Sequence, residues 1–223
     1  MTIVQASHLL DTKHPAWRPS PNPFTMSKIS IDIYSDTLCP WCYIGKRQLD
    51  SAISAYSTKH PDTEFELTWH PFLLHPKTRA SGIPKRTYFS AKYGPGADAF
   101  LAKVETTGEP LNIKFDWGGN SGSSYDSQKL VIAAETWEIQ SRFLDLLFRG
   151  HFEESRDISD RDFLVECAMQ AGLAGTEQEA ARAKDAWEEE LYIWVEDKPI
   201  RALERGQTAL SEEWFGTGGR GFS

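Results

Sequence analysis

The chain has 223 residues and a formal net charge of −8, with 40% hydrophobic and 25% charged residues. This size and balance fit one soluble globular domain with an inserted subdomain. The negative charge makes nucleic acid and anionic membranes poor partners, and no apolar run approaches the roughly 18 residues of a membrane span.

The first 28 residues form a polar leader that carries four prolines between positions 15 and 23. We expect residues 1–28 to be disordered, because such a composition cannot bury a core. Met26 is a plausible internal start, since it runs directly into the first predicted strand. The leader lacks the apolar core of a secretory signal, and the chain has only three cysteines. We therefore expect a cytoplasmic protein.

A strand, a turn and a helix are predicted around the sequence Cys39-Pro40-Trp41-Cys42. Residues 29–34 alternate apolar and polar side chains, as in a strand with one buried face. Pro40 fits the first position of a helix, and Pro61 ends it. Between them, apolar side chains recur at helical spacing: Leu49, Ile53 and Tyr56.

This arrangement predicts redox chemistry. A cysteine at a helix N-terminus has a lowered pKa, and its thiolate is a nucleophile. We expect Cys39 to attack and Cys42, one turn later on the same face, to resolve the mixed disulfide. Pro40 and Trp41 would tune the couple and shape its surface. Trp41 cannot donate a charged hydrogen bond, so we expect a less oxidising couple than a Cys-Pro-His-Cys site gives.

Two other interpretations of the cysteine pair stay open. A zinc site needs four ligands, and beyond this pair the chain offers only Cys167 and loop histidines such as His60, His70 and His75. We expect no metal. The second alternative is a pair of buried structural thiols. Strand, turn and helix together favour the redox interpretation.

After the motif, residues 64–70 predict a second strand, parallel to the first in a β-α-β unit. Residues 71–84 read as a loop, 97–106 as a helix and 118–124 as a flexible loop. From Asp126 onward the pattern is mostly helical, with a capping box at Ser159–Asp162 and a charged helix over 177–196. Cys167 falls on an apolar helix face and is expected in the core.

The motif resembles that of the DsbA-like thioredoxin-fold oxidoreductases, and in particular their FrnE-type branch. The similarity extends from about residue 29 to about residue 206. Four further segments carry it: Trp69–Pro76, Lys92–Gly94, Ser123–Leu130 and Leu147–Phe152. Within Ser123–Leu130, Ser123 and Gln128 stand where the branch usually has Asn and His.

The resemblance implies an α/β, thioredoxin-like fold with a large α-helical insertion. The family continues with Gly-Val-x-Gly-Val-Pro, whose cis-proline packs on the cysteines, and two more strands. Residues 207–223 contain no such segment, so we expect the C-terminal strands of the sheet to be lacking. The expected divisions are a leader (1–28), an N-terminal β-α-β part (29–76), a helical insertion (77–206) and a divergent, partly disordered tail (207–223).

The resemblance implies a thiol–disulfide oxidoreductase acting on a protein disulfide or on glutathione, with no bound cofactor. A glutathione-dependent isomerase or transferase on the same fold is an alternative, with Tyr43, Trp69 and Phe72 as candidate pocket residues. An inactive remnant or binding module is another. Substrate-binding residues and the oligomeric state are not predicted, and a dimer stays open.

Overall fold

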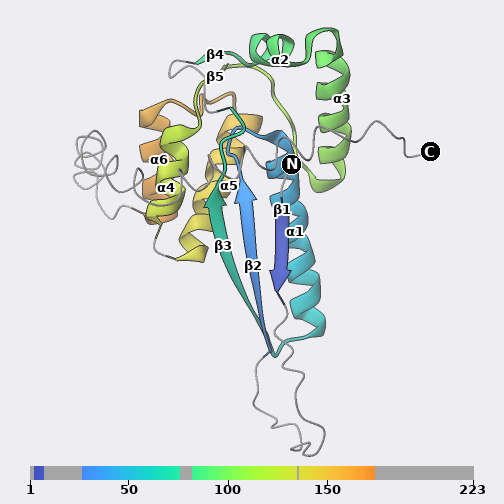
Figure 1. Ribbon diagram of the computed structural model, residues 1–223, viewed down its shortest axis with the longest axis vertical. Coiled ribbons are helices and arrows are strands. Elements are labelled where there is room, and N and C mark those ends of the chain that lie inside the picture. Colours follow the sequence, from blue (N-terminus) through green and yellow to red (C-terminus); the bar gives the residue numbers. More distant parts are fainter. Residues whose placement is uncertain (1–2, 8–26, 76–81, 135, 174–223) are drawn as a thin grey trace, which may run out of the picture.

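A three-stranded sheet in the order β1-β2-β3 lies at the centre of the computed structural model (Figure 1), which describes residues 3–7, 27–75, 82–134 and 136–173. Strand β2 spans Ser27–Ser35 and β3 spans Thr63–Pro71. Helix α1, Pro40–Lys59, connects them, and the two strands pair in parallel. The predicted β-α-β unit is therefore confirmed, with each strand slightly longer than its alternating pattern.

The inner face of the sheet is set by the two-residue repeat of a strand. On β2, Ile31 and Ile33 are buried and pair with Leu67 and Trp69 of β3. Ser35, at the end of β2, continues the same buried row. The apolar row thus ends in a polar residue where the chain turns towards the cysteines.

Strand β1, Ile3–Ser7, is the main departure from the sequence-based expectation. It pairs antiparallel with β2, from Ile3 opposite Tyr34 to Ser7 opposite Ser30. The expected disordered leader is therefore wrong at these five residues and at residues 27–28, which belong to β2. The physical reason is that a strand edge offers unpaired amide and carbonyl groups, which a short extended segment can satisfy.

The remaining described elements are mostly helical, in agreement with the expected α-helical insertion. A small antiparallel sheet joins β4 and β5. In chain order the elements are β4 (Ile83–Pro84), α2 (Lys85–Tyr93), η1 (Gly94–Gly96), α3 (Ala97–Gly108), η2 (Glu109–Leu111), β5 (Asn120–Ser121), α4 (Tyr125–Ala133), α5 (Trp137–Glu153) and α6 (Arg161–Ala171). Helices α4, α5 and α6 gather on one side of the sheet, and α2 and α3 lie beyond the end where α1 begins (Figure 1).

The capping residues explain where α6 begins and ends. Its N-cap is Asp160, whose carboxylate accepts from the amide of Asp162, rather than Ser159 as the sequence suggested. The shorter Asp160–Asp162 contact replaces the predicted capping box. At the other end, Gly172 has φ 83°, a left-handed conformation that glycine adopts without strain.

One apolar core unites the β-α-β part with the helical insertion. Tyr43 of α1 stacks on Phe148 and Phe152 of α5, with ring centroids 5.3 and 6.1 Å apart. The Tyr43 hydroxyl also donates to Glu153. Residues before and after position 76 therefore pack into one hydrophobic core, although the sequence suggested a boundary between two parts at that position.

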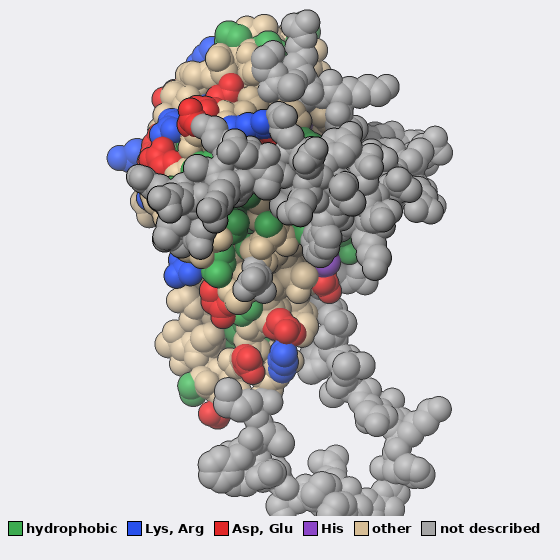
Figure 2. Space-filling model, turned by 90° about the vertical axis from the view of Figure 1, so that its left-hand side faces the viewer, with side chains coloured by type: hydrophobic (Ala, Val, Ile, Leu, Met, Phe, Trp, Pro, Cys, Tyr) green, Lys and Arg blue, Asp and Glu red, His purple; other side chains and the backbone are tan. Residues whose placement is uncertain are grey.

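The surface drawn in Figure 2 carries basic and acidic side chains interspersed, without a patch of one sign. No helix in the described ranges is both long and apolar enough to span a membrane. The predicted helix over 177–196 and the tail over 207–223 lie outside the described residues.

Candidate functional site

Cys39 is the N-cap of α1, and Pro40 opens the helix, as the sequence predicted. The turn before the helix is held by the amide of Cys39, which donates to the carbonyl of Asp36 at 3.0 Å. The amide of Cys42 in turn donates to the carbonyl of Cys39 at 3.0 Å. The two cysteines are thereby fixed one turn apart at the N-terminus of α1.

Cys39 and Cys42 are present as thiols and are buried, with 4% and 1% of their surface exposed. A hydrogen bond between the two side chains raises the pKa of Cys39 well above its usual value and lowers that of Cys42 to about 6. The cause is that one thiol donates to the other's thiolate, so the pair readily releases only its first proton.

The two cysteines ionise as a coupled pair, so the lowered pKa belongs to the pair rather than to one sulfur. The Cys42 sulfur accepts a hydrogen bond from the Cys39 thiol, and the amide of Asp36 and the side chain of Ser35 also favour its thiolate. The sequence-based expectation of an ionised thiol at the start of the helix therefore stays a prediction as regards which sulfur carries the charge.

Asp36 anchors the turn that carries Cys39. Its buried carboxylate accepts from the amide of Leu38 at 3.0 Å and from that of Leu74 at 2.7 Å. Burial raises the pKa of Asp36, and these hydrogen bonds oppose that rise. One carboxylate thus joins the turn before α1 to the segment that follows β3.

Helix α4 clamps the same turn from the insertion. The side-chain amide of Gln128 donates to the carbonyl of Ser35 at 2.8 Å and to that of Phe72 at 3.3 Å. The buried hydroxyls of Thr37 and Ser127 lie 2.7 Å apart. The C-terminal ends of β2 and β3 are therefore held together by one helix of the insertion.

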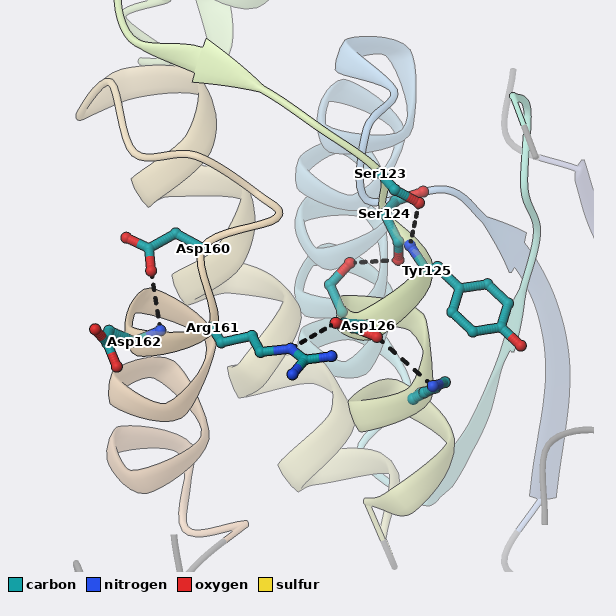
Figure 3. Close-up of polar contacts among 9 residues, drawn as sticks. Ser123, Ser124, Tyr125, Asp126, Asp160, Arg161 and Asp162 are labelled. Carbon is teal, nitrogen blue, oxygen red and sulfur yellow. Dashed lines mark hydrogen bonds and ion pairs between the residues drawn. The ribbon is translucent and has the colours of Figure 1, made fainter. Parts of the chain in front are cut away.

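Helix α4 is itself joined to α6 by an ion pair between Asp126 and Arg161 (Figure 3). Asp126 accepts from Arg161 at 3.0 Å and lies 3.6 Å from the ammonium of Lys129. The amide of Tyr125 donates to the hydroxyl of Ser123 at 3.2 Å. These contacts fix the start of α4, from which Gln128 reaches the active-site turn.

Aromatic and basic side chains of α2 and α3 lie near Trp41 and Cys39. Trp41 lies edge-on to Phe100, which stacks on Tyr93 at 4.1 Å between ring centroids. Burial, together with the nearby charge of Cys39, raises the pKa of Tyr93 to about 12. Burial lowers the pKa of Lys92, an effect that Cys39 and Asp36 partly offset. The insertion therefore places Tyr93 and Lys92 of α2 in the neighbourhood of Cys39.

The remaining candidate residues lie elsewhere. Cys167 is buried in α6, and burial raises its pKa to about 12, as expected of a core thiol. His70 lies 2.8 Å from Asp32. Within the described ranges, no three or more His, Cys, Asp or Glu side chains are arranged to hold a metal ion. Tyr43 and Trp69, named as candidate pocket residues, belong to the core.

A family model for the DSBA-like thioredoxin domain matches residues 30–192. The chain belongs to this family. Among curated proteins, the uncharacterised protein YwbO of Bacillus subtilis is 25% identical over 179 residues, covering 78% of each chain.

Two solved structures resemble this DSBA-like domain. The probable DsbA oxidoreductase SCO1869 from Streptomyces coelicolor is 26% identical, with a TM-score of 0.65 over 81% of this chain and 75% of that one. The cytosolic disulfide reductase DsbM from Pseudomonas aeruginosa is 20% identical, with a TM-score of 0.51 over 82% and 80% of the two chains, and shares the fold.

The sequence did not reveal the supports of the dithiol. Asp36 and Ser35 stand beside the motif, but nothing local shows that both are buried. Gln128 is 93 positions from Ser35 along the chain, so their contact requires the folded insertion. The one available signal was three successive polar residues, 35–37, at the end of an apolar strand.

Proposed function

We propose that this DSBA-family chain is a thiol–disulfide oxidoreductase whose reacting groups are Cys39 and Cys42. The observation that carries the proposal is the pair of hydrogen-bonded thiols at the start of α1, with one pKa lowered to about 6. Near neutral pH such a pair carries one negative charge, which is the state that attacks a disulfide.

The reaction exchanges two electrons. Proton transfer within the pair gives a Cys39 thiolate, which attacks one sulfur of the substrate disulfide; the other sulfur leaves as a thiolate. The Cys42 thiol then loses its proton, and its sulfur attacks Cys39. The Cys39–Cys42 bond forms as the mixed disulfide breaks and releases the second substrate thiolate. The reverse sequence oxidises a substrate dithiol.

Family membership and the 26% identical probable DsbA oxidoreductase support this activity. We assign the chain to the FrnE-type branch on the segments between residues 69 and 152 named above. We propose a protein disulfide or glutathione as substrate and the cytoplasm as compartment. The exchange needs no bound cofactor, because the two cysteines hold both electrons.

A redox titration of the full chain in glutathione buffers tests the proposal. Thiols are trapped at each buffer ratio and counted by mass. We expect one reversible two-electron transition that includes Cys39 and Cys42 and leaves Cys167 reduced. Its midpoint should fall in the roughly −270 to −120 mV range of thioredoxin-fold enzymes. Two independent one-thiol transitions would contradict the proposal.

Single substitutions separate the two roles. Cys42→Ser should accumulate a glutathione adduct on Cys39, because the resolving thiol is gone, whereas Cys39→Ser should abolish disulfide exchange. Cys167→Ser is the matched control and should cycle normally. Turnover that survives in Cys39→Ser would instead favour the glutathione-dependent isomerase or transferase interpretation.

A further inference from the structure

The hydroxyl of Ser35 is buried and lacks a hydrogen-bond partner in the described structure. Ser35 is 4% exposed, and no donor or acceptor lies in bonding geometry with its Oγ. Its carbonyl, in contrast, accepts two hydrogen bonds, from the amide of Phe72 at 3.1 Å and from the side chain of Gln128 at 2.8 Å. A buried, unpaired hydroxyl is costly and unusual in a folded protein.

Cys42 is the reacting residue with which the Ser35 side chain interacts. The Ser35 side chain and the amide of Asp36 both favour the Cys42 thiolate and lower the pKa of Cys42. Strand alternation places Ser35 on the buried row of Ile31 and Ile33. The two hydrogen bonds that the Ser35 carbonyl accepts hold the end of β2 in place.

We propose that Ser35 is a conditional donor, which hydrogen-bonds the Cys42 sulfur when that sulfur is a thiolate and is unpaired otherwise. A neutral thiol or a disulfide sulfur is a weak acceptor, whereas a thiolate is a strong one. The inference rests on the proposed function, for which it names a third residue at the reacting atoms. None of the signals in the sequence assigns this role to Ser35.

The proposed bond acts on both steps of the exchange. It stabilises the reduced pair that carries one thiol and one thiolate. The disulfide form therefore becomes less stable relative to the reduced form. The bond also favours the Cys42 thiolate that attacks Cys39 of the mixed disulfide and expels the substrate thiolate. Removing the hydroxyl should thus raise the pKa of Cys42 and make the couple more reducing.

The first test measures ionisation without requiring redox activity. In a Cys39→Ser, Cys167→Ser background, Cys42 is the only cysteine, and its ¹³Cβ resonance can be followed against pH after cysteine labelling. Ser35→Ala should raise the pKa of Cys42 by about one unit, a tenfold change in the acid dissociation constant. Ser35→Thr retains the hydroxyl and should restore the lower value.

The second test measures the equilibrium constant with glutathione in the full chain that keeps all three cysteines. A tenfold weaker ionisation from a pKa of about 6 should shift this constant by about fivefold at pH 7, in the reducing direction. That corresponds to roughly 20 mV for a two-electron couple. Ser121→Ala, at an equally buried serine of β5, is the control and should leave the constant unchanged.

A merely structural serine would give a different pattern. Because Ser35 Oγ makes no bond in the neutral pair, Ser35→Ala should not lower the melting temperature at pH 5. A large fall in melting temperature, or an unchanged pKa of Cys42, would overturn the proposal. A wild-type chain that does not cycle would refute the proposed function alone, since the first test would still report on Ser35.

Discussion

His151 is the most deeply buried histidine in the described part of the chain, at 1% exposure. It lies in α5, and its Nδ1–H donates to the carbonyl of Arg156 at 2.9 Å. A carbonyl only accepts, so this contact fixes the neutral tautomer with the proton on Nδ1. Burial, reinforced by the charge of Lys85, lowers the pKa of His151 to about 3.

This depressed pKa predicts a pH-dependent stability. The unfolded chain takes up a proton at His151 near pH 6.5, whereas the folded chain does so only near pH 3. The contribution is therefore complete above pH 6.5 and is lost as the pH falls to about 3, by on the order of 4 kcal/mol. Urea midpoints measured between pH 7 and pH 4 should fall steeply.

His151→Asn keeps an N–H for Arg156 but cannot titrate, so it should flatten this pH profile while losing some packing at pH 7. The exposed His60, replaced in the same way, should leave the slope intact. An equally steep slope in His151→Asn would show that another group is responsible.

At the scale of elements, Gln128 joins three of them: α4 and the ends of β2 and β3. Gln128→Ala leaves two buried carbonyls with one donor fewer, so we expect a loss of about 2 kcal/mol in the free energy of unfolding. Gln128→Glu should cost more, because a carboxylate oxygen repels the carbonyls that the amide contacts.

Urea denaturation measures both Gln128 variants. Gln170 is an exposed glutamine of α6. Gln170→Ala is the matched control and should change the free energy of unfolding by less than about 0.5 kcal/mol. If Gln128→Ala lowered the free energy of unfolding as little as Gln170→Ala does, the contacts of α4 would not be stabilising the turn before α1.

Strand β1 protects one edge of β2. A chain that starts at Met26 lacks the partner of residues 30–34 and exposes that edge. We expect its free energy of unfolding to fall by about 1–3 kcal/mol and its tendency to self-associate to rise, as seen by urea denaturation and size-exclusion chromatography. A full-length Val4→Pro, Ala6→Pro variant should behave similarly, because proline lacks the N–H of a strand ladder. Unchanged stability in both would mean that β1 is dispensable.

Sequence reasoning succeeded for elements that local signals define. Pro40 marks the start of α1, and alternation marks β2 and β3, because these patterns depend on neighbours within a few residues. It failed for β1, whose pairing depends on a free edge elsewhere in the fold. For the candidate site, the sequence placed both cysteines at the start of α1, but it did not reveal the donors that only the folded turn brings near Cys42.

At the scale of the whole molecule, the shared core predicts cooperative unfolding. Phe152 is fully buried and lies against Tyr43 of the helix that carries the cysteines. Phe152→Ala should cost about 3–5 kcal/mol. Because the core is continuous, we expect the helical signal in circular dichroism and the exposure of Cys39 and Cys42 to shift together.

Thiol labelling along a denaturant series, in a Cys167→Ser background, measures the exposure of Cys39 and Cys42. Circular dichroism along the same series gives the helical signal. Tyr56→Ala removes an exposed aromatic ring from the same helix α1 and should shift neither curve by much. Two separated transitions in Phe152→Ala would show that the insertion melts independently of the β-α-β part.

The burial of Cys39 and Cys42 has a kinetic consequence for the proposed function. A reagent cannot collide with Cys39 while 96% of its surface is covered, whatever its thermodynamic driving force. The observed rate with a small oxidant such as peroxide would then be the intrinsic thiolate rate multiplied by the fraction of molecules that are transiently open. A partner that itself stabilises the open form avoids that penalty. If the proposed function holds, we therefore expect the chain to react faster with such a partner than with a small oxidant of equal driving force.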